Sequence, residues 1–316
     1  MSMKVLLVGS GLMAKEYVKV LEGLNAPFDV VGRSDASAQA FTAETGHKVY
    51  TGGLEAFVRS ADIGVYSHFI VATNVTSLYG NVECLLQAGA KGILVEKPCV
   101  LAEEQLNSLC SLASVKQADV FIAYNRRFFA SVLKAKEIIE QDGGLEMVKF
   151  DFTEWSHIIE TLEKDPLEKE RWLLANSTHI IDLAFFFAGK PVELSTYVED
   201  GLAWHLAGKI FTGAGKSETG VLFSYGSDWG SAGRWWLELF TKERKLSLCP
   251  VEQLNETLKG TVVEKAVEID DSLDKQYKPG VFLQVEAFLG KNDSQLLDLH
   301  GLNKVFSCYC RIAGYE

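Results

Sequence analysis

The residues with the clearest chemistry form a glycine-rich turn near the start of the chain. The apolar run Val5–Val8 leads into Gly9-Ser10-Gly11-Leu12-Met13-Ala14, and apolar residues at helical spacing follow. In such a strand–turn–helix unit the first glycine permits a tight turn, the second lets the backbone approach a pyrophosphate, and a small third residue allows close packing. N–H groups at the helix start attract the phosphates. We therefore expect a dinucleotide to contact Gly9, Ser10, Gly11, Leu12 and Met13.

The end of the expected second strand indicates which dinucleotide binds. Here the sequence reads Gly32-Arg33-Ser34, where NAD-binding proteins normally carry an acid for the ribose hydroxyls. Arg33 can pair with the 2′-phosphate of NADP, and Ser34 can donate a hydrogen bond to it. We therefore favour NADP as the cofactor. NAD stays open because Asp35 is adjacent, and because Arg33 could instead stack on adenine or lie solvated on the surface.

Polar residues also follow the later strands, at the sheet edge where open α/β folds bind ligands. Thr73 and Asn74 follow the fourth apolar run, and Glu96-Lys97-Pro98 follows the fifth. We expect Thr73, Asn74, Glu96 and Lys97 beside the cofactor. Oxidation of an alcohol needs a group that takes the O–H proton while hydride leaves. Lys97 can do so if burial lowers its pKa, or it can stay charged and stabilise an alkoxide.

The end of the expected sixth strand carries candidates for substrate binding. Tyr124 and Asn125 can form hydrogen bonds to substrate or to the nicotinamide amide. Arg126 and Arg127 suit a carboxylate or phosphate of the substrate. Paired arginines at a domain junction equally suit ion pairs between domains. Both interpretations of the arginines stay open at this point.

A histidine at the start of an apolar helix is the other candidate. His179 follows Asn176-Ser177-Thr178, although a lone histidine in such a helix is more often a core residue held by a hydrogen bond. Asn176 can bind a substrate hydroxyl. Trp172 can stack on a sugar ring, but core packing explains it equally well.

These motifs together resemble the Gfo/Idh/MocA family, which includes glucose–fructose oxidoreductase and inositol dehydrogenase. The resemblance rests on the glycine loop, Glu96-Lys97-Pro98, the segment from Tyr124 to Phe128, and His179-Ile180-Ile181-Asp182. It implies a Rossmann domain, an α+β domain whose open sheet often forms the subunit interface, and hydride transfer between nicotinamide and a sugar-like or cyclitol carbon. It also implies that Lys97 and His179 form the proton-transfer site.

The sequence departs from the family at one position. Many relatives carry an aspartate four residues before the histidine, and this chain has Ala175 there. The change removes a carboxylate from the proton relay that the resemblance implies. It weakens an assignment to cyclitol or simple-sugar dehydrogenases.

The elements that must position these residues fall into two parts. Strands are expected at 5–8, 29–32, 63–72, 92–95 and 120–124, with helices at 12–24, 37–45, 75–88 and 103–116. This alternation predicts a doubly wound parallel sheet, the Rossmann type. After a helix at 177–188, strands at 193–198, 207–212, 219–225, 234–241 and 245–248 predict a large, mostly antiparallel open sheet. We therefore expect a dinucleotide-binding domain at 1–122 and an α+β substrate-binding and oligomerisation domain at 123–316.

Composition limits the partners. The chain has 31 Lys and Arg against 42 Asp and Glu, a net charge of −11, which disfavours nucleic acid and anionic membranes. No apolar run is long enough to cross a bilayer, and the start of the chain lacks the pattern of a secretory signal, so we expect a cytoplasmic protein. The six cysteines lack metal-ligand spacing, and no metal is expected. Aromatic residues at 234–241 favour a homo-oligomer, dimer or tetramer, through the second sheet.

The function that follows is hydride transfer between a nicotinamide cofactor and a polyhydroxylated small molecule, such as a sugar, sugar acid or nucleotide sugar. Two alternatives remain. One is a reductase of a non-sugar carbonyl or conjugated ligand. The other is a non-catalytic NADP-binding sensor or partner protein, which Ala175 favours.

Overall fold

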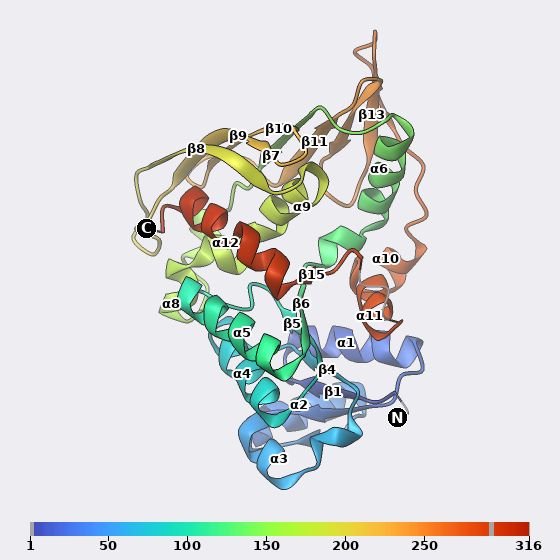
Figure 1. The fold of residues 1–316 in the computed structure, drawn as a ribbon, viewed down its shortest axis with the longest axis vertical. Coiled ribbons are helices and arrows are strands. Elements are labelled where there is room, and N and C mark those ends of the chain that lie inside the picture. Colours follow the sequence, from blue (N-terminus) through green and yellow to red (C-terminus); the bar gives the residue numbers. More distant parts are fainter. Residues whose placement is uncertain (1–2, 291–293, 316) are drawn as a thin grey trace. The chain divides into compact units, whose positions relative to one another are not determined.

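A computed structural model describes residues 3–290 and 294–315 (Figure 1). The chain forms two compact units, one of Met1–Asn125 with Gln276–Asn303, and one of Arg126–Lys275 with Lys304–Glu316. The sequence predicted one domain boundary, after residue 122. In the structure the chain also returns to the first unit at Gln276–Asn303, which was not predicted. This return is held because β15 (Leu297–Asp298) pairs with β6 (Asp119–Ala123) and α11 (Val281–Gly290) packs against α1 (Leu12–Gly23).

The first unit is built on a seven-stranded sheet in the order β15-β6-β5-β4-β1-β2-β3, in which only β15 is antiparallel. Its other elements are β1 (Val5–Val8), β2 (Phe28–Val31), α2 (Asp35–Thr45), β3 (Val49–Tyr50), α3 (Leu54–Ser60), β4 (His68–Val71), α4 (Leu78–Ala88), β5 (Gly92–Glu96) and α5 (Glu103–Lys116). β1 lies between β2 and β4, and all its residues are buried, as expected for a strand covered on both faces.

The predicted strand at 63–72 is shorter in the structure. Only His68–Val71 forms β4, and a 3₁₀ turn at Ile63–Val65 precedes it. The Asp62 side chain accepts a hydrogen bond from the Gly64 N–H (2.9 Å) and so caps this turn. Local capping therefore outweighs the apolar character of the segment. β3 and α3, which the sequence analysis did not predict, complete the sheet edge and its cover.

The second unit carries an eight-stranded sheet in the order β14-β13-β12-β11-β7-β10-β9-β8, with β7 and β10 as its one parallel pair. The strands are β7 (Met147–Asp151), β8 (Pro191–Glu199), β9 (Ile210–Ser217), β10 (Leu222–Asp228), β11 (Trp236–Phe240), β12 (Arg244–Leu248), β13 (Asn255–Leu258) and β14 (Glu264–Ala266). The helices are α6 (Ala130–Gln141), α7 (Ser156–Ile159), α8 (Pro166–Glu170), α9 (Thr178–Ala188) and α10 (Ser272–Gln276), with α12 (Leu299–Ala313) spanning the second division of the chain. The predicted fold class is confirmed.

Helix α9 covers one face of this sheet and packs on β7 and β11. Side chains along β7 and β11 alternate between buried and half-buried, so the two faces of the sheet differ. Trp235 is buried and Trp236 is half-buried. Self-association through the other face stays a prediction. Within residues 3–290 and 294–315, no helix combines the length and the apolar character that crossing a bilayer requires.

A buried ion pair ties α9 to the start of the second unit. Arg127 donates from Nε (2.8 Å) and from a terminal nitrogen (2.6 Å) to the two carboxylate oxygens of Asp182. Tyr309 of α12 donates a third hydrogen bond to Asp182 (3.3 Å). Because all three residues are buried, the loss of either charge would leave the other uncompensated.

Asp182→Asn should lower the free energy of unfolding of the second unit by about 3 kcal/mol or more, since the Arg127 charge would stay buried without its partner. All six tryptophans lie in this unit, so the urea midpoint from tryptophan fluorescence measures the effect. The control is Lys134→Ala, which removes the exposed pair with Glu137 and should cost less than about 1 kcal/mol. Equal midpoints for the two variants would contradict the role of the buried pair.

Candidate functional site

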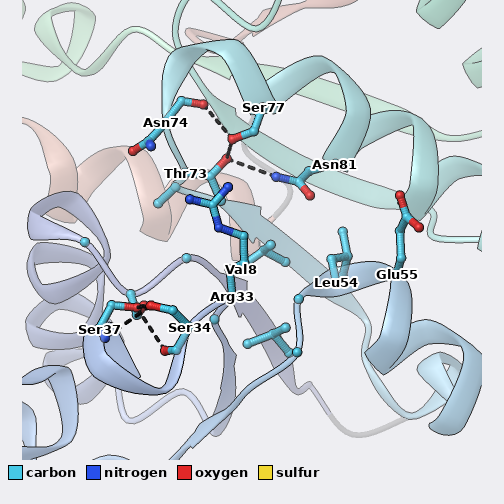
Figure 2. Close-up of a pocket in the computed structure, with 18 residues that line it drawn as sticks. Val8, Arg33, Ser34, Ser37, Leu54, Glu55, Thr73, Asn74, Ser77 and Asn81 are labelled. Atoms are coloured by element: carbon cyan, nitrogen blue, oxygen red, sulfur yellow. Dashed lines mark hydrogen bonds between the residues drawn. The ribbon is translucent and has the colours of Figure 1, made fainter. Parts of the chain in front are cut away.

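A pocket of about 490 Å³ opens in the first unit at the carboxyl ends of β1, β2 and β4 (Figure 2). In the sheet, β1 lies between β2 and β4, and the strand order reverses direction at this place. Doubly wound sheets bind their ligands at such a switch point. Its lining consists of Val8, Gly9, Ser10, Gly11, Val31, Gly32, Arg33, Ser34, Ser37, Gly52, Gly53, Leu54, Glu55, Ala72, Thr73, Asn74, Ser77 and Asn81.

The two glycines of the loop have different roles. Gly9 has a φ of +124°, and a Cβ on it would overlap the carbonyl oxygen of Ala72. A Cβ on Gly11 would meet no atom within 4 Å, so it would occupy the open cradle itself. Gly11 is also the N-cap of α1 and provides no capping side chain, which leaves the first N–H groups of the helix to a ligand. This cradle fits a diphosphate.

Arg33 is the cation of the pocket. Its side chain is exposed and, in the described part of the chain, forms no hydrogen bond or ion pair. Figure 2 shows it pointing toward Thr73. Asp35 starts α2 and does not line the pocket. The end of β2 therefore presents a positive charge, as the sequence predicted.

Ser34 is partly engaged in local structure. Its hydroxyl caps α2 by accepting a hydrogen bond from the Ser37 N–H (3.3 Å). The Ser37 hydroxyl lies 2.9 Å from that of Ser34 and 3.1 Å from that of Ser10. These three hydroxyls form one chain at the pocket wall, and Ser37 is a member that the sequence analysis missed.

Thr73 and Asn74 are held by the start of α4. The Thr73 hydroxyl accepts from Ser77 (3.1 Å) and from the Asn81 amide (3.0 Å), as Figure 2 shows. Ser77 also donates to the Asn74 carbonyl (2.8 Å). Ser77 and Asn81 were not among the predicted site residues. The Gly52–Glu55 turn was not predicted either, although its Gly-Gly pair was an available signal.

Other predicted cofactor residues do not line this pocket: Leu12, Met13, Glu96 and Lys97. Glu96 ends β5 and accepts a hydrogen bond from the Tyr17 hydroxyl of α1 (2.7 Å), which joins the helix of the glycine loop to the end of β5. Burial raises the pKa of Glu96, while Tyr17 and the lysines at 97 and 278 oppose the rise. Lys97 is half-buried, and the Lys97–Pro98 peptide bond is cis.

Tyr124 and Asn125 follow β6 and contact the returning segment of the first unit. Tyr124 is buried, and the Asn125 amide donates to the carbonyl of Pro279 (2.9 Å). In the orientation that satisfies the Gln284 amide, its oxygen accepts from the backbone N–H groups of Asn125 (3.1 Å) and Tyr124 (3.2 Å). The Asn125 side-chain amide, which was expected to bind substrate, thus forms a hydrogen bond to the returning segment of the first unit.

His179 is the second residue of α9 and is 7% exposed. A π-helical turn, Leu173–Ser177, precedes α9 and contains Ala175. π-Helical turns are rare in proteins overall. Where they do occur, they often lie at functional sites. The ring centroid of His179 lies 6.2 Å from that of Trp235. Trp172 is buried with its ring edge-on to Trp204, so packing accounts for its environment.

A buried carboxylate that was not predicted from the sequence lies close to this turn. Glu154 follows β7, and its Oε1 accepts from the Asn176 amide (2.8 Å) and the Ser177 hydroxyl (2.7 Å). Its Oε2 pairs with Arg234 (3.3 Å). Burial raises the pKa of Glu154, and these donors oppose the rise. β7 was not predicted, so nothing in the sequence indicated that Glu154 would reach the turn that carries Ala175.

Comparisons with known proteins agree with this geometry. Residues 3–124 match the model of an oxidoreductase family with an NAD-binding Rossmann fold, Gfo/Idh/MocA. No curated protein matches the chain.

Solved structures share the fold at low sequence identity. Levoglucosan dehydrogenase in complex with NADH is 15% identical, with 99% of this chain and 97% of that chain covered and a TM-score of 0.81. A putative NADPH-dependent oxidoreductase from Desulfitobacterium hafniense is 13% identical (98% and 94% covered, TM-score 0.80). UDP-N-acetylglucosamine 3-dehydrogenase from Acidithiobacillus ferrooxidans is 14% identical (98% and 96% covered, TM-score 0.76). Residues 3–124 therefore match the Gfo/Idh/MocA family of oxidoreductases with an NAD-binding Rossmann fold, the family that the motifs of the chain resemble.

Proposed function

We propose that the protein is an NADP-dependent oxidoreductase acting on a CH–OH group of a polyhydroxylated small molecule. The observation that carries the proposal is the pocket in the first unit. It combines an open glycine cradle with an arginine at the end of β2 that forms no ion pair within residues 3–290 and 294–315. The family match supports an NAD-binding oxidoreductase, and the sugar and nucleotide-sugar dehydrogenases among the similar structures support the substrate class.

Different residues of the pocket would bind different parts of the dinucleotide. Gly9 and Gly11 would let the backbone approach the diphosphate, and the start of α1 would supply N–H donors. Arg33 would pair with the 2′-phosphate. When bound, the cofactor accepts or supplies the hydride.

Proton transfer would rest on Lys97 and His179. Lys97 is half-buried beside Glu96, an environment in which a lysine can hold or release the proton of a substrate hydroxyl. His179 would be the second group that binds or exchanges a proton with that hydroxyl. Glu154 supports this assignment, because it supplies a carboxylate next to the π-helical turn in which Ala175 stands.

Gly11→Val should weaken NADPH binding at least about tenfold, about 1.4 kcal/mol, because the isopropyl group would fill the open cradle. NADPH fluorescence titration measures the effect. Gly80→Val is the matched control, since Gly80 lies in α4 with equally open surroundings and outside the pocket. Tight NADPH binding by the Gly11 variant would rule out the cradle.

Arg33→Ala should reduce NADPH affinity about tenfold and leave NADH affinity unchanged, because only NADPH carries the 2′-phosphate. Separate titrations with the two cofactors test this. Lys48→Ala removes one positive charge from the exposed surface of the same unit and should change neither affinity. If Arg33→Ala keeps its affinity for NADPH, the preference for NADP is wrong.

Lys97→Met should lower turnover roughly 100-fold or more while NADPH binding stays within about twofold, since a proton-transfer group contributes on this scale. Turnover is followed by nicotinamide absorbance over a panel of polyols, sugars and sugar acids. Unchanged turnover would remove Lys97 from the mechanism. NADPH binding by the native protein with no oxidation of any compound would favour the non-catalytic sensor.

A further inference from the structure

The two adjacent arginines at the start of the second unit have opposite environments. Arg127 is committed to the buried ion pair with Asp182. Arg126, in contrast, forms no hydrogen bond or ion pair with any residue that the structure describes, although its Nε is buried. The residue as a whole is partly exposed. Its Nε thus has no partner among the described residues, and a ligand can supply one.

Aromatic rings fix the position of this guanidinium. Its central carbon lies 4.7 Å from the ring centroid of Trp235 and 5.7 Å from that of Phe129. Both rings are buried, so they cannot move aside easily. A planar cation held against rings presents its N–H edge in one direction, which is the arrangement that recognises a planar anion with two parallel hydrogen bonds.

The surrounding charges leave this cation uncompensated at close range. Burial lowers the pKa of Arg126 to about 10, with a contribution from the like charge of Arg234, so Arg126 stays positive at neutral pH. The Glu154 carboxylate is occupied by Arg234, Asn176 and Ser177. Glu252 is exposed to solvent, where its attraction is screened.

Trp235 connects Arg126 with the proposed reaction site. Its ring contacts the Arg126 guanidinium on one hand and lies 6.2 Å from the ring of His179 on the other. Arg234 also lies over this ring, 5.0 Å from its centroid. A molecule that reaches His179 is therefore within a few atoms of Arg126.

We propose that Arg126 binds a carboxylate of the substrate, so that the substrate is a polyhydroxy acid rather than a neutral sugar. This inference rests on the proposed function. A carboxylate fits better than a phosphate because its single negative charge matches the single positive charge of Arg126. The planar carboxylate also matches the fixed edge of the guanidinium.

The test uses aldonates and uronates of five and six carbons, each paired with its neutral sugar or methyl ester, and hexose 6-phosphates as a separate arm. Calorimetry measures binding to the native protein with and without NADPH, and nicotinamide absorbance measures KM and kcat. We expect at least one acid to bind about 100-fold more tightly than its neutral partner. Arg126→Gln should remove this difference by raising the Kd and KM for the acid, while the neutral partner is unaffected.

Two further variants control for folding and charge. Arg126→Lys keeps the charge but loses the planar edge, and it should retain part of the preference, with about tenfold weaker binding of the acid. Arg311→Gln removes one charge from α12 in the same unit and should keep the full preference. Urea midpoints equal to that of the native protein would show that both Arg126 variants are folded.

Three outcomes would overturn the inference: no acid binds better than its neutral partner, a sugar phosphate is preferred, or Arg126→Gln keeps the preference for the acid. Failure of the proposed function is seen separately. In that case the native protein binds neither NADPH nor NADH, whereas the calorimetric preference for an acid does not require the cofactor.

Discussion

The close approach of Gly9 to the carbonyl of Ala72 is the contact on which the pocket depends. The Gly9 N–H donates to Val31 at the end of β2 (2.8 Å), and the Ala72 N–H donates to Val8 at the end of β1 (2.8 Å). The loop is thus fixed between two neighbouring strands, with no room for a side chain at residue 9. Because the ends of β1, β2 and β4 are held together in this way, the residues that follow each strand face a single cavity.

In the second unit, the hydrogen bonds and ion pair of one buried carboxylate, Glu154, hold the local structure together. Glu154 is almost fully buried, and an isolated carboxylate there would be costly. The Asn176 amide, the Ser177 hydroxyl and Arg234 supply donors to it, so the π-helical turn before α9 is held from β7. The family resemblance implies a carboxylate at the position of Ala175 in this turn, and the chain carries one that reaches the turn from the segment after β7.

Adjacent residues of one type can thus have different environments. Arg126 and Arg127 lie in the 3₁₀ turn Asn125–Phe128, where successive side chains point about 120° apart. Arg127 is directed into the core toward Asp182, and Arg126 lies against Trp235 without a hydrogen-bond partner for its Nε among the described residues. The alternatives for the pair were an ion pair between domains and a ligand site. Arg127 instead pairs with Asp182 within the second unit, and the ligand site stays a proposal for Arg126.

The sequence alone determined the features that depend on neighbours along the chain. The strand–glycine–helix unit, Arg33 in place of an acid, and the alternation of strands and helices follow from local patterns and short connections. Tertiary structure decided what depends on residues far apart: the return of 276–303 to the first sheet, Ser37 beside Ser10, and Glu154 beside Ser177. Such contacts result from strand pairing and from the need to satisfy buried polar groups, and neither leaves a periodic signal in the sequence.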